Sequence, residues 1–100
     1  MDIARWNKFN LPQKLGNIGS EVARARLSEE KKDYKSRDAA LERVFGMLDL
    51  ILDAQPTPAQ KKELSRVREL LNCWYSGQDL SSFSPLLIEE YFTQFAFLIA

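Results

Sequence analysis

The residue types best suited to nucleophilic or acid–base chemistry are not combined for it in this sequence. The chain has one cysteine, Cys73, and no histidine. A thiolate or a serine hydroxyl would therefore have no imidazole to accept its proton. The usual zinc and haem sites also draw on histidine or on several cysteines. We therefore expect no enzyme activity, no metal site and no cofactor.

Carboxylates form two close pairs along the chain. Asp49 and Asp53 are one helical turn apart, and Glu89 and Glu90 are adjacent. Each pair falls away from the apolar positions of its own segment, so these side chains are expected to be solvated. An acid–base pair would need a shared, partly buried environment that separates the two pKa values. The sequence does not predict one here.

Basic residues offer a different chemistry, the binding of phosphate groups. The whole chain balances 14 Lys and Arg against 14 Asp and Glu, so a basic surface can only be local. Residues 1–26 hold five basic and two acidic side chains, and residues 29–38 hold four of each. The candidates for contacting nucleic acid are Lys14, Arg24, Lys31, Lys32, Lys35 and Arg37. Arg26 projects close to an apolar stripe and is expected to pair with a carboxylate near the end of the bundle.

Helices must position these side chains, because apolar residues recur at spacings of three and four in four segments. The predicted helices cover about residues 11–30, 36–53, 58–76 and 85–100. Thr57, Pro58 and Gln60 give the clearest helix start, and Gly77 is placed to end that helix. Ser84 and Pro85 open the last one. The expected buried stripes are Leu11, Leu15, Ile18, Val22 and Ala25; Leu41, Val44, Phe45, Leu48, Ile51 and Leu52; Leu64, Val67, Leu71 and Trp74; and Leu87, Ile88, Tyr91, Phe92, Phe95 and Ile99.

Four amphipathic helices joined by short connections predict an all-α fold, most simply an antiparallel up-and-down four-helix bundle formed by residues 1–100 as one domain. A helical hairpin of the tetratricopeptide kind is the alternative architecture. Gly16, Gly19, Ser20 and Ala23 leave room for another helix to approach closely. The N-terminus lacks a signal-peptide pattern and no segment reaches the length of a membrane span, so we expect a cytoplasmic protein.

Several apolar side chains fall outside the predicted stripes and suggest a second buried surface. Leu50 is expected to face directly away from the core side of its helix, and Leu86 and Phe97 share the polar side of the last helix. Trp6 and Phe9 precede the first predicted helix, where packing over the open end of the bundle is the simpler expectation. The candidate interface for an oligomer or a partner is Trp6, Phe9, Leu50, Leu86 and Phe97.

Three segments carry a family resemblance: LPQKLGNIGSE at residues 11–21, RA at 24–25 and YFTQFA at 91–96. They resemble small bacterial four-helix proteins related to the ribosomal-RNA intervening-sequence protein group, which includes the accessory variability determinant of diversity-generating retroelements. The resemblance implies a four-helix protomer that assembles into a ring, commonly a pentamer. It also implies that a basic outer surface binds RNA or DNA together with a reverse transcriptase.

These observations favour a non-enzymatic accessory bundle that oligomerises and binds nucleic acid with a partner enzyme such as a reverse transcriptase. The alternative is a protein–protein interaction module, an adaptor or a neutralising partner, that does not bind nucleic acid. A third class is a small-molecule-binding bundle, for which Trp74, Tyr75 and Tyr91 are the only candidates.

Overall fold

The computed structural model of the chain describes residues 2–78 and 84–97, with side chains up to residue 94. It contains five helices, and the described residues form no strand. In chain order the helices are α1 (Ile3–Asn7), α2 (Leu11–Glu30), α3 (Tyr34–Asp53), α4 (Pro58–Tyr75) and α5 (Pro85–Phe97). The all-α fold class is thereby confirmed. No helix within the described part of the chain is both long and apolar enough to span a bilayer.

The starts of α2 and α4 follow from the same local chemistry. In each, a polar N-cap side chain accepts a hydrogen bond from a backbone N–H three residues on, and a glutamine returns one to the N-cap backbone. For α4 the pair is Thr57 and Gln60, as the sequence predicts, with distances of 3.2 and 3.0 Å. For α2 it is Asn10 and Gln13, at 2.9 and 2.8 Å. The Asn10 cap was not predicted, although its spacing to Gln13 is the same.

The end of α4 is a Schellman turn around Gly77, which has φ +75°. The Gly77 N–H donates to the carbonyl of Trp74, and the Gln78 N–H donates to that of Cys73. The same pair of bonds ends α2, where the N–H groups of Lys32 and Asp33 donate to the carbonyls of Glu29 and Ser28. There the left-handed position is held by a lysine, Lys32, at φ +60°.

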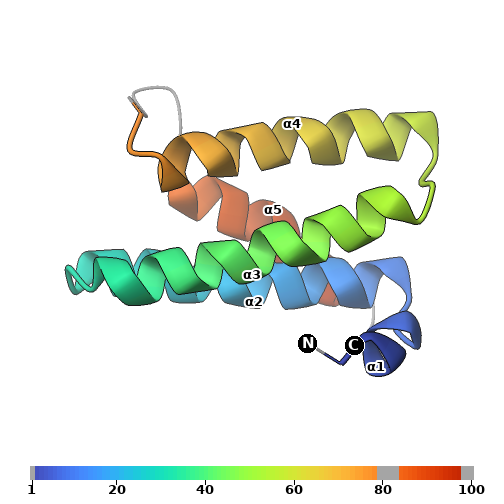
Figure 1. Cartoon of the computed structure of the whole chain (residues 1–100), viewed down its shortest axis with the longest axis horizontal. Helices are drawn as coiled ribbons and strands as arrows, with labels where there is room; N and C mark the ends of the chain where they lie inside the picture. The colour runs from blue at the N-terminus through green and yellow to red at the C-terminus, as the bar shows by residue number, and fades with distance from the viewer. Residues whose placement is uncertain (1, 79–83, 98–100) are drawn as a thin grey trace.

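Helix α2 makes its most extensive contacts with α3 and α5, and Figure 1 shows α3 running in front of α2. Helix α4 packs mainly against α3, and α1 folds back near the start of α2. The radius of gyration is 13.2 Å, close to the ~13 Å expected for a folded chain of this length. Fully buried apolar side chains come from α2, α3, α4 and α5, among them Ile18, Leu41, Leu48, Trp74 and Phe92.

A close approach of α2 and α5 depends on Gly19. A Cβ atom at this position would lie 2.9 Å from Cβ of Phe92 and 3.2 Å from the backbone nitrogen of Thr93. Since such contacts are far below the ordinary packing distance, only glycine fits here without movement of α5. The expectation that the small residues of this helix admit a neighbouring helix is confirmed at Gly19.

The predicted helix bounds agree with the structure to within two residues wherever the ends are described. Helix α1 was not predicted, because five residues are too few for a periodic apolar pattern. The expected burial of two apolar side chains was wrong. Leu87 is 65% exposed, because the buried stripe of α5 runs through Ile88 and Phe92 and leaves Leu87 on its flank. Leu50 is half-buried against the core, because α3 is covered on more than one side.

Candidate nucleic-acid interface

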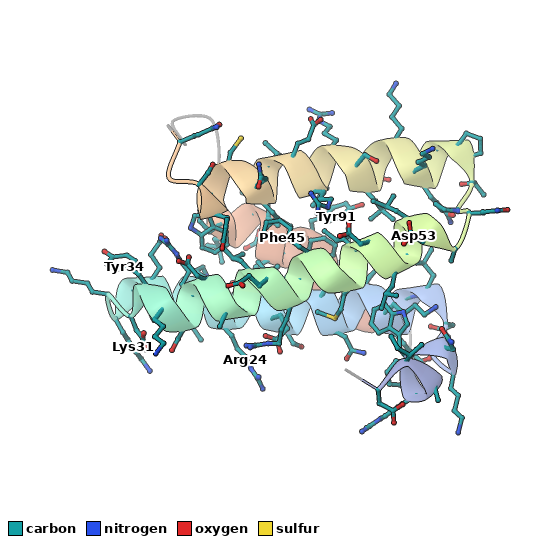
Figure 2. The ribbon with its side chains drawn as sticks, in the orientation of Figure 1. Arg24, Lys31, Tyr34, Phe45, Asp53 and Tyr91 are labelled. Atoms are coloured by element: carbon teal, nitrogen blue, oxygen red, sulfur yellow. The ribbon has the colours of Figure 1, made fainter. Side chains whose placement is uncertain are left out.

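The turn between α2 and α3 carries a cluster of exposed cations. Lys31, Lys32 and Lys35 are all exposed, and Tyr34 between them is 50% exposed. Figure 2 shows Lys31 and Tyr34 at the free end of the α2–α3 pair. We call these four residues the lysine turn. Three ammonium groups beside an accessible aromatic ring can contact phosphates and stack on a base.

The acidic side chains next to the lysine turn are held by other partners. One oxygen of Glu29 accepts hydrogen bonds from Nη1 of Arg37 at 2.9 Å and from the indole N–H of Trp74 at 3.0 Å. Asp38 accepts from Nη2 of Arg37 at 3.0 Å. Partial burial disfavours the charged guanidinium, but the bonds to Glu29 and Asp38 outweigh it and raise the pKa of Arg37. Both carboxylates are therefore held by Arg37 and form no ion pair with a lysine of the turn.

A second arginine, Arg26, forms an ion pair with Glu30, the other glutamate next to the turn. Arg26 pairs with Glu89 of α5 and, at 2.8 Å, with Glu30. The hydrogen bond to Glu89 is the main reason that the pKa of Arg26 is raised. The expectation that Arg26 pairs with a carboxylate near the end of the bundle is confirmed. The bridge also joins α2 to α5 close to the lysine turn.

Asp33 lies inside the turn but acts as the N-cap of α3, accepting from the backbone N–H of Ser36 at 3.1 Å. Hydrogen bonds from Ser36 lower the pKa of Asp33. Among the described residues, Lys31, Lys32 and Lys35 form no ion pair. All three ammonium groups are exposed, and the charges of Lys35 and Lys31 also help to lower the pKa of Asp33.

The other predicted phosphate-contacting residues lie elsewhere. Lys14 is half-buried with its ammonium 5.4 Å from the ring centre of Trp6, a cation–π arrangement. The Arg37 side chain is only 15% exposed and holds the network described above. Arg24 is 70% exposed and contacts Glu21 at 3.3 Å. Lys31, the C-cap of α2, follows it by seven residues, and both side chains point away from the ribbon in Figure 2.

The predicted interface residues are also spread over the molecule. Trp6 is 4% exposed and belongs to the core, which agrees with the simpler expectation that it packs against the bundle. Phe9 and Leu50 are half-buried against that core. Leu86 is exposed in the first turn of α5. The Phe97 side chain lies outside the described residues.

Sequence reasoning missed other exposed apolar side chains at this end of the bundle. Leu27 lies in the last turn of α2, Tyr75 is the last residue of α4 and Leu87 lies in the first turn of α5, and all three are exposed, as is Leu86. These helix ends lie at the same end of the molecule in Figure 1. The apolar periodicity of a single helix could not show that these exposed residues lie at one end, because they come from three different helices.

The carboxylate pairs are not arranged as an acid–base pair. Asp49 accepts from Nε of Arg68 at 2.8 Å. The expectation that Glu89 is solvated was wrong, because its side chain is only 17% exposed and pairs with Arg26 of α2. Within the described part of the chain, no group of three or more His, Cys, Asp or Glu side chains could hold a metal ion. Comparison with protein-family models, curated proteins and solved structures gave no significant match.

Proposed function

We propose that this protein is a non-enzymatic helical bundle that binds single-stranded RNA or DNA through the lysine turn, as an accessory to an enzyme such as a reverse transcriptase. One observation carries the proposal. Lys31, Lys32 and Lys35 are exposed without an ion pair among the described residues, although acidic residues adjoin them in sequence. Those acids are occupied by Arg26 and Arg37 or cap a helix.

The physical basis is release of counterions from the nucleic acid. Each lysine that neutralises a phosphate of a single strand contributes about −0.7 to the slope of log affinity against log salt. Three lysines therefore predict a slope of about −2. Tyr34 adds base stacking, which depends little on sequence. The guanidinium carbon of Arg37 lies 4.9 Å from the ring centre of Tyr34, and this cation–π contact holds the ring at the turn.

One lysine turn gives weak binding, so we propose that repetition in an oligomer supplies the affinity. In this proposal α2 to α5 form an antiparallel four-helix protomer, and the exposed apolar residues Leu27, Leu86 and Leu87 contribute to contacts between protomers. A ring of protomers, such as a pentamer, would present several lysine turns to one strand.

The test is fluorescence anisotropy of a labelled oligouridylate titrated with the protein at a series of salt concentrations. Changing Lys31 and Lys32 together to Glu is expected to weaken binding at low salt by at least about tenfold and to flatten the salt slope. Lys61 and Lys62 of α4 are adjacent and exposed, so changing both to Glu gives a control with the same charge change. Equal loss in the two double variants would contradict a localised site.

A protein-interaction module remains the second candidate, and the exposed side chains of Leu27, Leu86 and Leu87 favour it. Exposed apolar residues gathered at one end of a small domain are typical of a docking surface. This function predicts a complex that is insensitive to salt and to the Lys31 and Lys32 changes, but is lost when Leu86 and Leu87 become Ser. A pull-down from a lysate freed of nucleic acid, at low and at high salt, separates the two functions.

A further inference from the structure

A cavity of about 470 Å³ lies between α1 and the α2–α3 pair. Its volume falls within the roughly 300–1,000 Å³ of typical small-molecule sites. Trp6, Phe9 and Met47 supply apolar and aromatic lining. Trp6 and Met47 are themselves almost fully buried, so this part of the wall is held in place by the core. Little of Trp6 and Met47 is therefore exposed, so the half-buried Phe9 supplies most of the accessible apolar lining.

Charged groups surround that apolar lining. Arg5, Arg24 and Arg43 face two carboxylates, Asp2 and Glu21, which leaves one positive charge in excess. Asp2 is occupied as the N-cap of α1, where it accepts the backbone N–H of Arg5 at 3.2 Å. The excess of positive charge favours an anionic ligand.

Glu21 fixes the two arginines of the longer helices. One of its oxygens accepts from Nη1 of Arg24 at 3.3 Å, and the other accepts from Nε of Arg43 at 2.9 Å. A guanidinium has five N–H donors, so both arginines retain donors for a ligand. The guanidinium of Arg5 forms no ion pair among the described residues. A ligand anion would thus meet pre-oriented donors from two helices and one free arginine from α1.

We propose that this cavity binds a small organic anion that joins an aromatic ring system to one anionic group. The ring lies against Phe9, beside the buried Trp6, and the anionic group accepts from Arg5 and Arg24. This site is separate from the lysine turn, since Lys31 follows Arg24 by seven residues, about 10 Å along the helix. Both aromatic carboxylic acids and nucleoside monophosphates have this chemistry.

The test follows the two indole N–H signals of the labelled protein by NMR. The probes are 2-naphthoate with its neutral counterpart 2-naphthalenemethanol, and adenosine 5′-monophosphate with adenosine. We expect an anion to shift the Trp6 indole signal in a saturable manner, while the signal of Trp74, which lies in the core away from the cavity lining, stays in place. Response to only one of the two anions identifies which source the site prefers.

Arg5→Gln is expected to weaken the bound anion about tenfold, as for loss of a charge-assisted hydrogen bond. Arg66→Gln is the matched control, because Arg66 is exposed on α4 and lines no part of the cavity. Asn17→Phe places a ring in the cavity and is expected to abolish binding. Because Asn17 is exposed on α2, the fold should tolerate this change. Lys32→Glu should leave probe binding unchanged, so this site and the lysine turn are tested separately.

Three results would overturn the proposal: no saturable shift of the Trp6 signal with either anion, equal binding of the neutral counterparts, or equal effects of Arg5→Gln and Arg66→Gln. Thermal melting of each variant accompanies the titrations. A folded Arg5→Gln protein with unchanged affinity counts against the site.

Discussion

Lys32 holds a backbone conformation that costs energy. Its φ of +60° is the left-handed position of the turn that ends α2, where Gly77 stands in the equivalent turn after α4. A side chain there costs roughly 1 kcal/mol relative to glycine. Residues kept in such conformations are often functional, and an exposed lysine in the proposed interface fits that pattern.

Lys32→Gly should therefore separate stability from binding. We expect the free energy of unfolding to rise by about 0.5–1 kcal/mol, measured by urea denaturation, while affinity for oligouridylate falls. Lys31→Gly is the control, because Lys31 has φ −85° and gains nothing from glycine. A loss of stability in Lys32→Gly would show that the lysine side chain makes a stabilising contact there.

Asp33 gives the turn a dependence on pH. Hydrogen bonds from Ser36 lower its pKa from the ordinary value of 3.8, so its stabilising effect is full above that value and is lost as pH falls through the lowered pKa. Asp33→Asn keeps a capping oxygen but removes the charge. We expect thermal melting of the variant to depend less on pH below about 4 than that of the parent protein. Identical acid profiles would argue against a charged cap.

Residue type alone could not say which of the basic candidates are exposed. Lys31, Lys32 and Lys35 are exposed as required, whereas Arg37 is committed to two carboxylates that its sequence neighbourhood does not reveal. Trp74 also binds Glu29, 45 residues away in sequence. Pairings over such distances depend on how helices pack, so spacing along one helix cannot give them.

At the scale of helices, two glycines should respond in opposite ways to the same substitution. Gly19→Ala would force its new methyl against Phe92 and Thr93, and should destabilise the protein by about 1–3 kcal/mol. Gly46→Ala meets nothing within 4 Å in the middle of α3, and should stabilise it by about 1 kcal/mol. Urea denaturation of both variants measures the pair. A neutral Gly19→Ala would mean that α2 and α5 separate easily.

Helix positions were the most predictable part of the fold. Capping and apolar spacing are local, so Thr57, Gln60 and Gly77 could be interpreted without knowing what packs where. Leu87 and Leu50 were misjudged because burial depends on neighbouring helices. Helix α1, and with it the cavity, escaped prediction because five residues show no period.

At the scale of the whole molecule, the exposed apolar residues at one end predict self-association. We expect light scattering after size exclusion to give a mass several times that of one chain at both low and high salt, since apolar contacts are not screened. Changing Leu86 and Leu87 to Ser should shift the protein toward the mass of one chain. If the protein is a monomer at all concentrations, each particle has only one lysine turn to bind nucleic acid. This result would contradict assembly into a ring.

The most direct test of the central claim is to map where a nucleic acid touches the protein. Labelled protein is titrated with a short oligouridylate, and the backbone amide shifts are followed by NMR. Binding at the lysine turn predicts the largest changes at residues 31–35 and their loss at high salt. Changes confined to α4, or to the cavity around Arg5 and Trp6, would contradict binding at the lysine turn, as would the absence of any change at low salt.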